Sequence, residues 1–378
     1  MPSALFVTTV DITLEAFLLP FAAHLREAGW RVDALARGAE TNDRIASAFD
    51  ARFDAGWTRS PFSPASIGAI RRVRQVVSEG SYDLVWVHTP VAAMITRFAL
   101  RKRAGRPVVI YTAHGFHFYE GGRSFVNAVY RTVERAAAAW TDYLVTINAE
   151  DYSAARGFRT IPPERVLRFP GIGVDPTGYA PSSTAERARM RTDLGVPPDS
   201  ILVTMIAEFT PNKRHALALA ALAEVETPNV YVAFAGNGPL LDEVRRDAAR
   251  RGLEDRVRLC GYRRDVPALL GASDAVMLVS AREGLSRSLL ESMASGVPLI
   301  GTPTRGIADL IGRDETGWVA KSHSREDLSA AIDAAAADPD ERIRRGRVGL
   351  ERARADYSIA KVLDAYDDLF AQALEAQT

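Results

Sequence analysis

The sequence of 378 residues contains one cysteine and no excess of either charge. Because Cys260 has no second cysteine to pair with, a disulfide framework cannot form within the chain, and we expect a reducing compartment. The 47 Lys and Arg residues equal the 47 Asp and Glu residues, which gives a formal net charge of +0. We expect no nucleic-acid partner.

Long apolar runs are missing as well. No window reaches the ~18 uninterrupted apolar residues of a transmembrane helix. The first residues, MPSALFVTTVD, have neither a basic leader nor an apolar stretch long enough for a signal peptide. We therefore expect a cytoplasmic protein, or one held peripherally on the inner face of the plasma membrane.

The composition is that of a globular protein, with 47 % hydrophobic and 25 % charged residues, and the length suits two domains. Apolar runs typical of buried parallel strands alternate with helical patterns, which predicts two doubly wound, Rossmann-like α/β domains facing across a cleft. The predicted domains are 1–175 and 176–356, and a helix in 357–378 is predicted to pack back on the first domain. The predicted strands are 4–10, 30–36, 83–88, 107–113, 142–148 and 165–175 in the first half, and 201–209, 230–239, 257–262, 275–280 and 296–301 in the second.

The first strand is followed by a short loop around Asp11, and a helix is predicted over 14–28. No Gly-x-Gly-x-x-Gly pattern follows this strand. The absence counts against a dehydrogenase-type dinucleotide site.

Residues 280–310 carry the strongest candidate for a site, because Glu283 and Glu291 flank a helical pattern there. A helix beginning near Leu285 or Ser286 would offer unpaired N–H groups to a phosphate. Two carboxylates eight helical positions apart would lie about 12 Å apart along the axis. A nucleotide sugar has that length, with hydroxyls at both ends and a diphosphate between them.

Two histidines follow the predicted strand 107–113. His114 lies where it can face a ligand, whereas His117 is expected to be structural or to shape the site. The pair is not expected to bind a metal, since two ligands without a nearby cysteine or suitably spaced carboxylate do not make a site.

Basic residues concentrate between 67 and 106 and again in the predicted helix 123–140. The first stretch contains eight basic and only two acidic residues. Two alternatives remain: a patch that binds anionic lipid, and solvated helix faces. The eight residues are Arg71, Arg72, Arg74, Arg97, Arg101, Lys102, Arg103 and Arg106.

Several longer motifs resemble the retaining GT-B glycosyltransferases of family 4, and the likeness covers nearly the whole chain. The motifs are EGLSRSLLESMASGVPLIGT, AEFTPNKRH, AGNGPL and GYRRDVPALLGASD, together with TTVDITLEAFLLPFAAHLREAGW and YTAHGFHFYEGG, which look like members found in exopolysaccharide and capsule clusters.

This resemblance implies a role for particular residues. Lys213 would contact the donor diphosphate, Glu283 and His114 would approach the transferred sugar, and Glu291 would bind the ribose hydroxyls. The other residues implied at the donor site are Gly284, Leu285, Ser286, Arg287, Gly236, Asn237, Tyr262 and Arg263. Asp11 and His117 are placed on the acceptor side.

Two positions depart from the family pattern. Glu208 stands where many relatives have a second phosphate-binding arginine, and Arg214 or Arg287 are the candidates to replace it. Thr8–Asp11 stands where relatives often have a glycine-rich loop, so acceptor contacts there do not carry over.

The resemblance implies a retaining transfer of a hexosyl or N-acetylhexosaminyl group from a nucleotide sugar, expected to be UDP-linked, to a lipid-linked or polysaccharide acceptor. No cofactor and no obligatory metal are expected. A sugar-nucleotide epimerase of similar fold and a non-catalytic nucleotide-sugar binder remain as alternatives.

Overall fold

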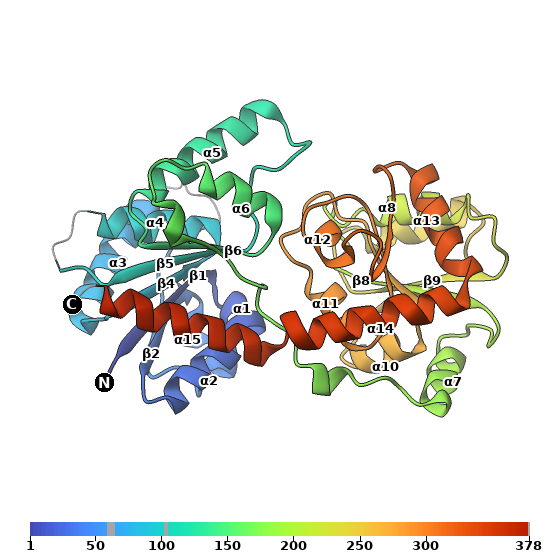
Figure 1. Cartoon of the computed structure of the whole chain (residues 1–378), viewed down its shortest axis with the longest axis horizontal. Helices are drawn as coiled ribbons and strands as arrows, with labels where there is room; N and C mark the ends of the chain where they lie inside the picture. Colours follow the sequence, from blue (N-terminus) through green and yellow to red (C-terminus); the bar gives the residue numbers. More distant parts are fainter. Residues whose placement is uncertain (59–64, 102–104, 377–378) are drawn as a thin grey trace. The chain divides into compact units, whose positions relative to one another are not determined.

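The computed structural model describes residues 1–58, 65–101 and 105–376. Its contacts divide the chain into two compact units (Figure 1). Unit 1 comprises Met1–Ile172 and Val362–Thr378, and unit 2 comprises Gly173–Lys361. Each unit contains one parallel sheet, which confirms the predicted pair of α/β domains.

Within the described residues, the sheet of unit 1 has seven strands in the order β3-β2-β1-β4-β5-β6-β7. All residues of β4 and β5 are buried, as expected for parallel strands that helices cover on both faces. The strands are β1 Ser3–Val10, β2 Arg31–Arg37, β3 Arg52–Phe53, β4 Leu84–His88, β5 Val108–Ala113, β6 Tyr143–Thr146 and β7 Val166–Arg168.

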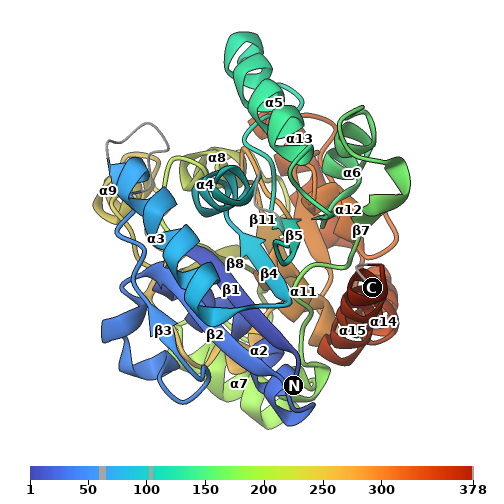
Figure 2. The same cartoon turned by 90° about the vertical axis from the view of Figure 1, so that its left-hand side faces the viewer.

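Helices α3 and α4 cover one face of this sheet, and α2 and α15 cover the other (Figure 2). On α15, Tyr366 and Phe370 pack with their ring centroids 4.5 and 5.3 Å from that of Trp86. The last helix is therefore part of the core of unit 1. The helices are α1 Asp11–Thr13, α2 Leu19–Glu27, α3 Ala65–Gly80, α4 Pro90–Leu100, α5 Ser124–Ala138, α6 Ala149–Arg156 and α15 Ile359–Glu375.

The loop predicted around Asp11 is wrong, because α1 begins at Asp11 itself and a π-helical segment, Leu14–Leu18, joins it to α2. No glycine or proline separates the strand from the helix to force a loop. In addition, a carboxylate in the first turn is favourable beside the unpaired N–H groups of a helix.

The sheet of unit 2 has six strands in the order β10-β9-β8-β11-β12-β13. They are β8 Ile201–Ile206, β9 Val230–Ala235, β10 Val257–Gly261, β11 Ala275–Leu278, β12 Leu299–Gly301 and β13 Gly317–Val319. The helices are α7 Thr184–Asp193, α8 His215–Leu222, α9 Leu241–Arg250, α10 Val266–Ala272, α11 Arg287–Ala294, α12 Ile307–Ile311, α13 Arg325–Ala337 and α14 Pro339–Asp356.

The predicted basic surface between 67 and 106 is wrong at Arg97. Its side chain is fully buried in α4, and Nη2 lies 2.9 Å from Oε2 of Glu134 on α5. Arg106 is also paired with a carboxylate, while Lys102 and Arg103 lie outside the described residues. Within the described residues, no helix is both long and apolar enough to cross a bilayer.

Candidate active site

The sheet of unit 2 has a switch point at its first strand. The chain runs from β8 to β9 and β10 on one side and then returns to β11 on the other side of β8. The loops that follow β8 and β11 therefore lie side by side at the carboxyl edge of the sheet. In open α/β sheets this is where ligands bind.

The two loops at this switch point bring together two predicted catalytic residues. Lys213, in the loop after β8, donates from Nζ to Oε2 of Glu283, in the loop after β11, over 2.8 Å. Their side chains are 22 % and 15 % exposed. A cation and a carboxylate from motifs 70 residues apart thus meet at one partly open point.

Asn212 joins the same two loops and was not singled out by the sequence. Its backbone oxygen accepts from the N–H of Ala281 over 2.8 Å. Its side-chain amide donates to the backbone oxygen of Arg282 over 3.0 Å and accepts from the Arg282 N–H over 3.2 Å. This double contact fixes the position of Lys213 relative to Glu283. The sequence signals only a polar loop, because the partner is far away along the chain.

The helix expected to begin near Leu285 or Ser286 begins at Arg287, and the side chain of Ser286 caps it by accepting from the Leu289 N–H over 3.4 Å. Glu283 consequently lies in a loop. The estimate of two helix-borne carboxylates about 12 Å apart is wrong, since it assumed one continuous helix. Only Glu291 is on α11.

Glu291 is held by two neighbours. Its Oε1 accepts from Oη of Tyr179 over 2.7 Å and from Nε of Arg287 over 2.8 Å. Burial and the Glu291 carboxylate raise the pKa of Tyr179, so the phenol stays protonated and acts as a donor. Tyr179 was not among the predicted site residues, because it precedes α11 by more than 100 residues.

Two glycine contacts hold neighbouring loops close to this site. A Cβ on Gly236, whose φ is +149°, would lie 2.1 Å from the oxygen of Ala207. A Cβ on Gly306 would lie 2.0 Å from the oxygen of Gly284. Such distances exclude any side chain, so both glycines permit a backbone approach that the loops require.

The remaining predicted donor residues are more dispersed. The backbone oxygen of Asn237 accepts from the N–H of Phe209 in the loop after β8. Leu285 packs against the hydrophobic core of unit 2. Tyr262 is 71 % exposed, and Arg263 is paired with Asp265.

Both candidates to replace the second phosphate-binding arginine have partners within the described chain. Nη1 of Arg214 lies 3.2 Å from Nδ1 of His323, and Arg287 contacts Glu291. A further cation contacts this loop: Nε of Arg305, in the loop after β12, donates to the backbone oxygen of Glu283 over 3.2 Å. Sequence reasoning did not identify Arg305.

In unit 1 the corresponding switch point lies between β1 and β4. Thr89, which follows β4, has a φ of +61°. Its hydroxyl donates to the His88 oxygen over 2.5 Å and accepts from the Thr9 N–H over 2.9 Å. This network holds the loops after β1 and β4 together at the carboxyl edge of the sheet.

His114 lies at the same edge, after β5. Its Nε2 is 2.9 Å from Nδ1 of His88. Desolvation lowers the pKa of His114 to about 4, so its imidazole is neutral at pH 7. His88 is the last residue of the predicted strand 83–88 and was not predicted to contact His114.

The two predicted acceptor-side residues contact other parts of unit 1. Oδ2 of Asp11 accepts from Nδ2 of Asn42 over 2.8 Å. The ring of His117 lies 5.1 Å from that of Tyr130 on α5.

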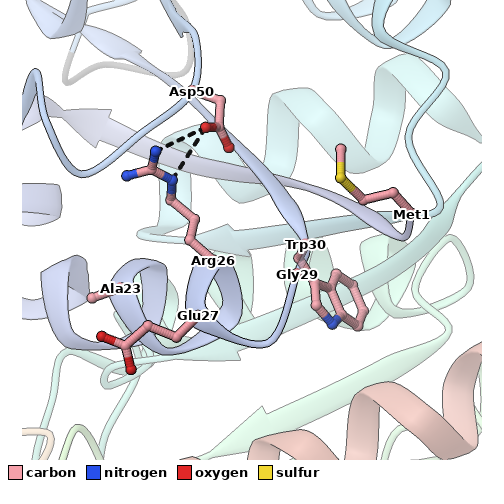
Figure 3. Close-up of a pocket in the computed structure, with 7 residues that line it drawn as sticks. All are labelled: Met1, Ala23, Arg26, Glu27, Gly29, Trp30 and Asp50. Carbon is pink, nitrogen blue, oxygen red and sulfur yellow. Dashed lines mark hydrogen bonds and ion pairs between the residues drawn. The ribbon is translucent and has the colours of Figure 1, made fainter.

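A separate pocket of about 440 Å³ lies at the amino edge of the unit 1 sheet (Figure 3). Arg26 lines it, and Nε of this arginine donates to Oδ1 of Asp50 over 3.1 Å. Met1 and Trp30, which immediately precede the β1 and β2 region, also line it. The pocket is thus at the opposite end of the strands from His114.

Comparisons of the sequence with protein families and with known proteins all match glycosyltransferases. Residues 186–352 match the family described as Glycosyl transferases group 1, and residues 14–171 match the Glycosyl transferase 4-like domain. The chain is 31 % identical over 377 residues to the putative glycosyltransferase EpsD of Bacillus subtilis (strain 168), which covers 99 % of this chain and 97 % of the relative.

A second relative is the UDP-Gal:alpha-D-GlcNAc-diphosphoundecaprenol alpha-1,3-galactosyltransferase of Escherichia coli. It is 28 % identical over 274 residues, covering 71 % of this chain and 69 % of the relative. Among solved structures, Anabaena HepE in complex with UDP and glucose has a TM-score of 0.80 and 19 % identity, and the match covers 98 % of this chain and all of that one. The likeness to HepE shows the fold, which is the GT-B architecture.

Proposed function

We propose, from the premise that this chain belongs to the group 1 glycosyltransferases, that it transfers a sugar from a UDP-sugar to a lipid-linked or polysaccharide acceptor with retention of configuration. The observation that carries the proposal is the Lys213–Glu283 pair at the switch point of unit 2. The Escherichia coli relative is named for a UDP-Gal donor and a diphosphoundecaprenol-linked acceptor, which supports the donor and acceptor classes. Both curated relatives above are named glycosyltransferases, which does not favour an epimerase.

In this proposal the reaction breaks the bond between the anomeric carbon and the phosphate oxygen, and the electron pair leaves with UDP. An acceptor hydroxyl forms the new bond on the same face, and its proton passes to the departing phosphate. Lys213 and the N–H groups at the start of α11 stabilise the negative charge that develops on the diphosphate. Glu283 accepts from sugar hydroxyls and Glu291 from the ribose.

Donor binding is proposed to need no divalent cation, because the Lys213 ammonium and backbone N–H groups take the role of charge stabilisation. Arg305 is proposed to supply the second contact to the phosphate, because Glu208 stands where many relatives have an arginine for this contact. Hexosyl and N-acetylhexosaminyl donors both remain within the proposal, since the proposed contacts are to the diphosphate, the ribose and sugar hydroxyls, which both donors have.

The test of this function is a transfer reaction with UDP-sugars and a lipid-linked acceptor, in which NMR follows the anomeric configuration of the product. The expected product has the configuration of the donor. An inverted product would refute the retaining mechanism. Conversion of the donor to its 2-epimer without transfer would identify an epimerase, and binding without turnover on any acceptor would identify a non-catalytic binder.

Tyr179 gives a prediction for the donor site. Tyr179→Phe removes the hydroxyl that orients Glu291 and is expected to weaken UDP-sugar affinity by about threefold to tenfold, the range for one lost hydrogen bond. The measurement is the dissociation constant by calorimetry. Tyr231→Phe, in β9 of the same unit, is the control and should leave affinity unchanged. Equal affinities of the two variants would contradict the role of Tyr179.

A peripheral position on the inner membrane face is proposed for the acceptor reaction, and α5 is the element that supports it. In Figures 1 and 2 the α5 ribbon projects from the body of unit 1. Phe125, Val129 and Tyr130 on this helix are 81, 39 and 36 % exposed. Arg123 and Arg131 are exposed beside them. An apolar helix face next to basic residues suits an anionic lipid surface.

We expect the protein to float with anionic vesicles at low salt and the Phe125→Asp variant to float markedly less, because a carboxylate would enter the apolar face. Ile343→Ser is the matched control, since Ile343 is 71 % exposed but lies on α14 of unit 2. No flotation of the unmodified protein, or equal flotation of the Phe125→Asp variant, would exclude membrane attachment through α5.

A further inference from the structure

The carboxyl edge of unit 1 contains two histidines in direct contact, one behind the other. His88 ends β4 and is 1 % exposed, while His114 follows β5 and is only partly buried. Nδ1 of His88 and Nε2 of His114 are 2.9 Å apart, which is a hydrogen-bond distance between two ring nitrogens. One of these two nitrogens must therefore carry a proton and donate it to the other.

Both rings are neutral at pH 7, which restricts where their protons can be. Desolvation lowers the pKa of His88 well below its usual value and that of His114 to about 4. A neutral imidazole carries one N–H donor and one acceptor nitrogen. Only two arrangements therefore satisfy the contact: His88 donates from Nδ1, or His114 donates from Nε2.

The second nitrogen of His88 distinguishes the two arrangements. Nε2 of His88 is buried and has no hydrogen-bond partner among the described residues. If His114 were the donor, His88 would carry its proton on Nε2 as a buried N–H without an acceptor. Orphaned buried N–H groups are rarer in proteins than under-used acceptors. The pairing therefore favours a proton on Nδ1 of His88, donated to Nε2 of His114.

The tautomer of His88 also determines the tautomer of His114, the more exposed of the two residues. Because Nε2 of His114 accepts from His88, the single proton of His114 is on Nδ1, and the contact with His88 is the only hydrogen bond that His114 makes within the described chain. We propose that His88 is a positioning residue that holds His114 in the Nδ1–H tautomer, so that His114 meets a ligand oxygen as a hydrogen-bond donor and not as a base. That this oxygen belongs to a phosphate or hydroxyl of a nucleotide sugar rests on the proposed function. The tautomer of His114 is independent of the proposed function.

The backbone around His88 supports a fixed position. The hydroxyl of Thr89 donates to the His88 oxygen, and the ring of His88 packs with its centroid 4.4 Å from that of Trp86. His88 and Thr112 are also register partners in the parallel pair β4–β5. A ring that is held in this way presents Nδ1 to His114 in one orientation.

The tautomer is tested directly by ¹⁵N NMR of protein labelled at histidine. The chain contains only six histidines, so few signals are expected. His114→Gln assigns the resonances. We expect the His114 Nδ1 signal in the range of protonated ring nitrogens and the Nε2 signal in the range of unprotonated ones. The reverse pattern in the unmodified protein would overturn the proposal.

Two variants separate positioning from a merely structural role. His88→Asn keeps an amide N–H near the place of Nδ1 and should preserve the His114 pattern, whereas His88→Leu removes the donor and should yield a mixture of tautomers. His24→Leu is the control, because His24 contacts Asp367 at the surface of unit 1 and should leave His114 unchanged. An unchanged His114 spectrum in His88→Leu would refute the role of His88.

A second measurement separates this inference from the proposed function. With a UDP-sugar present, His88→Leu is expected to lower kcat/KM of transfer by about tenfold, the value of one lost hydrogen bond, and His88→Asn to restore most of it. If the tautomer is as expected but no nucleotide sugar shifts the His114 signals, the positioning role holds and the proposed function of His114 fails. Equal transfer rates in His88→Leu and His88→Asn would contradict a link between the His114 tautomer and sugar transfer.

Discussion

Lys213→Ala is expected to lower kcat/KM of sugar transfer by about 10²–10³, the range for removing one group that stabilises transition-state charge. The structure adds a second cause. Nζ of Lys213 donates a hydrogen bond to Oε2 of Glu283. In the variant, the Glu283 carboxylate has lost this cation and lies where the anionic diphosphate is proposed to bind. Repulsion between the two then adds to the loss of attraction.

Initial rates with a fixed UDP-sugar and acceptor measure this effect. Lys321→Ala is the matched control, because Lys321 is an exposed lysine of the same unit and should retain the unmodified rate. Lys213→Arg keeps the charge but not the compact ammonium, and is expected to be intermediate. A Lys213→Ala rate within twofold of the unmodified protein would contradict a phosphate-binding role.

Glu134→Ala is expected to lower the unfolding free energy of unit 1 by about 3–5 kcal/mol, because breaking a buried ion pair leaves an uncompensated charge. Arg97 is fully buried, and its Nη2 contacts Glu134 Oε2 over 2.9 Å. Its guanidinium carbon also lies 4.1 Å from the centre of the Tyr111 ring. Without Glu134 this guanidinium remains buried and has no ion-pair partner among the described residues.

Urea unfolding followed by tryptophan fluorescence measures the change in unit 1, since four of the five tryptophans, Trp30, Trp57, Trp86 and Trp140, lie there. Replacing both partners, with Arg97→Met and Glu134→Leu together, is expected to recover much of the stability. Asp242→Ala is the control, because the Arg245–Asp242 pair is on the surface and contributes only about 0–1 kcal/mol. A midpoint for Glu134→Ala equal to that of the control would contradict a stabilising pair.

The sequence predicted the two-sheet fold because buried parallel strands are continuous apolar runs between helical patterns. It missed β13, Gly317–Val319, which is three residues long. It also missed β3, which has two residues. Segments this short carry no periodicity. The π-helical segment was missed for a related reason, since a change in backbone hydrogen bonding alters no side-chain pattern.

The candidate site could be predicted only where residue types within one motif indicate their chemistry. Glu283 and Glu291 were identified this way, whereas Lys213 was implied by the family resemblance, and the structure brings Lys213 and Glu283 into contact. Asn212, Tyr179 and Arg305 act through partners in other loops, so their roles depend on sheet order. Arg97 shows the opposite error: it was counted as surface charge because its burial depends on Glu134, 37 residues away.

Isothermal calorimetry with UDP, GDP and their common sugar conjugates, with and without EDTA, tests the proposed donor site most directly. We expect micromolar affinity for at least one UDP-sugar, no change on adding EDTA, and loss of binding in Lys213→Ala but not in Lys321→Ala. Binding that disappears with EDTA would contradict the metal-free site. No binding of any nucleotide sugar would contradict the donor site at Lys213 and Glu283 altogether.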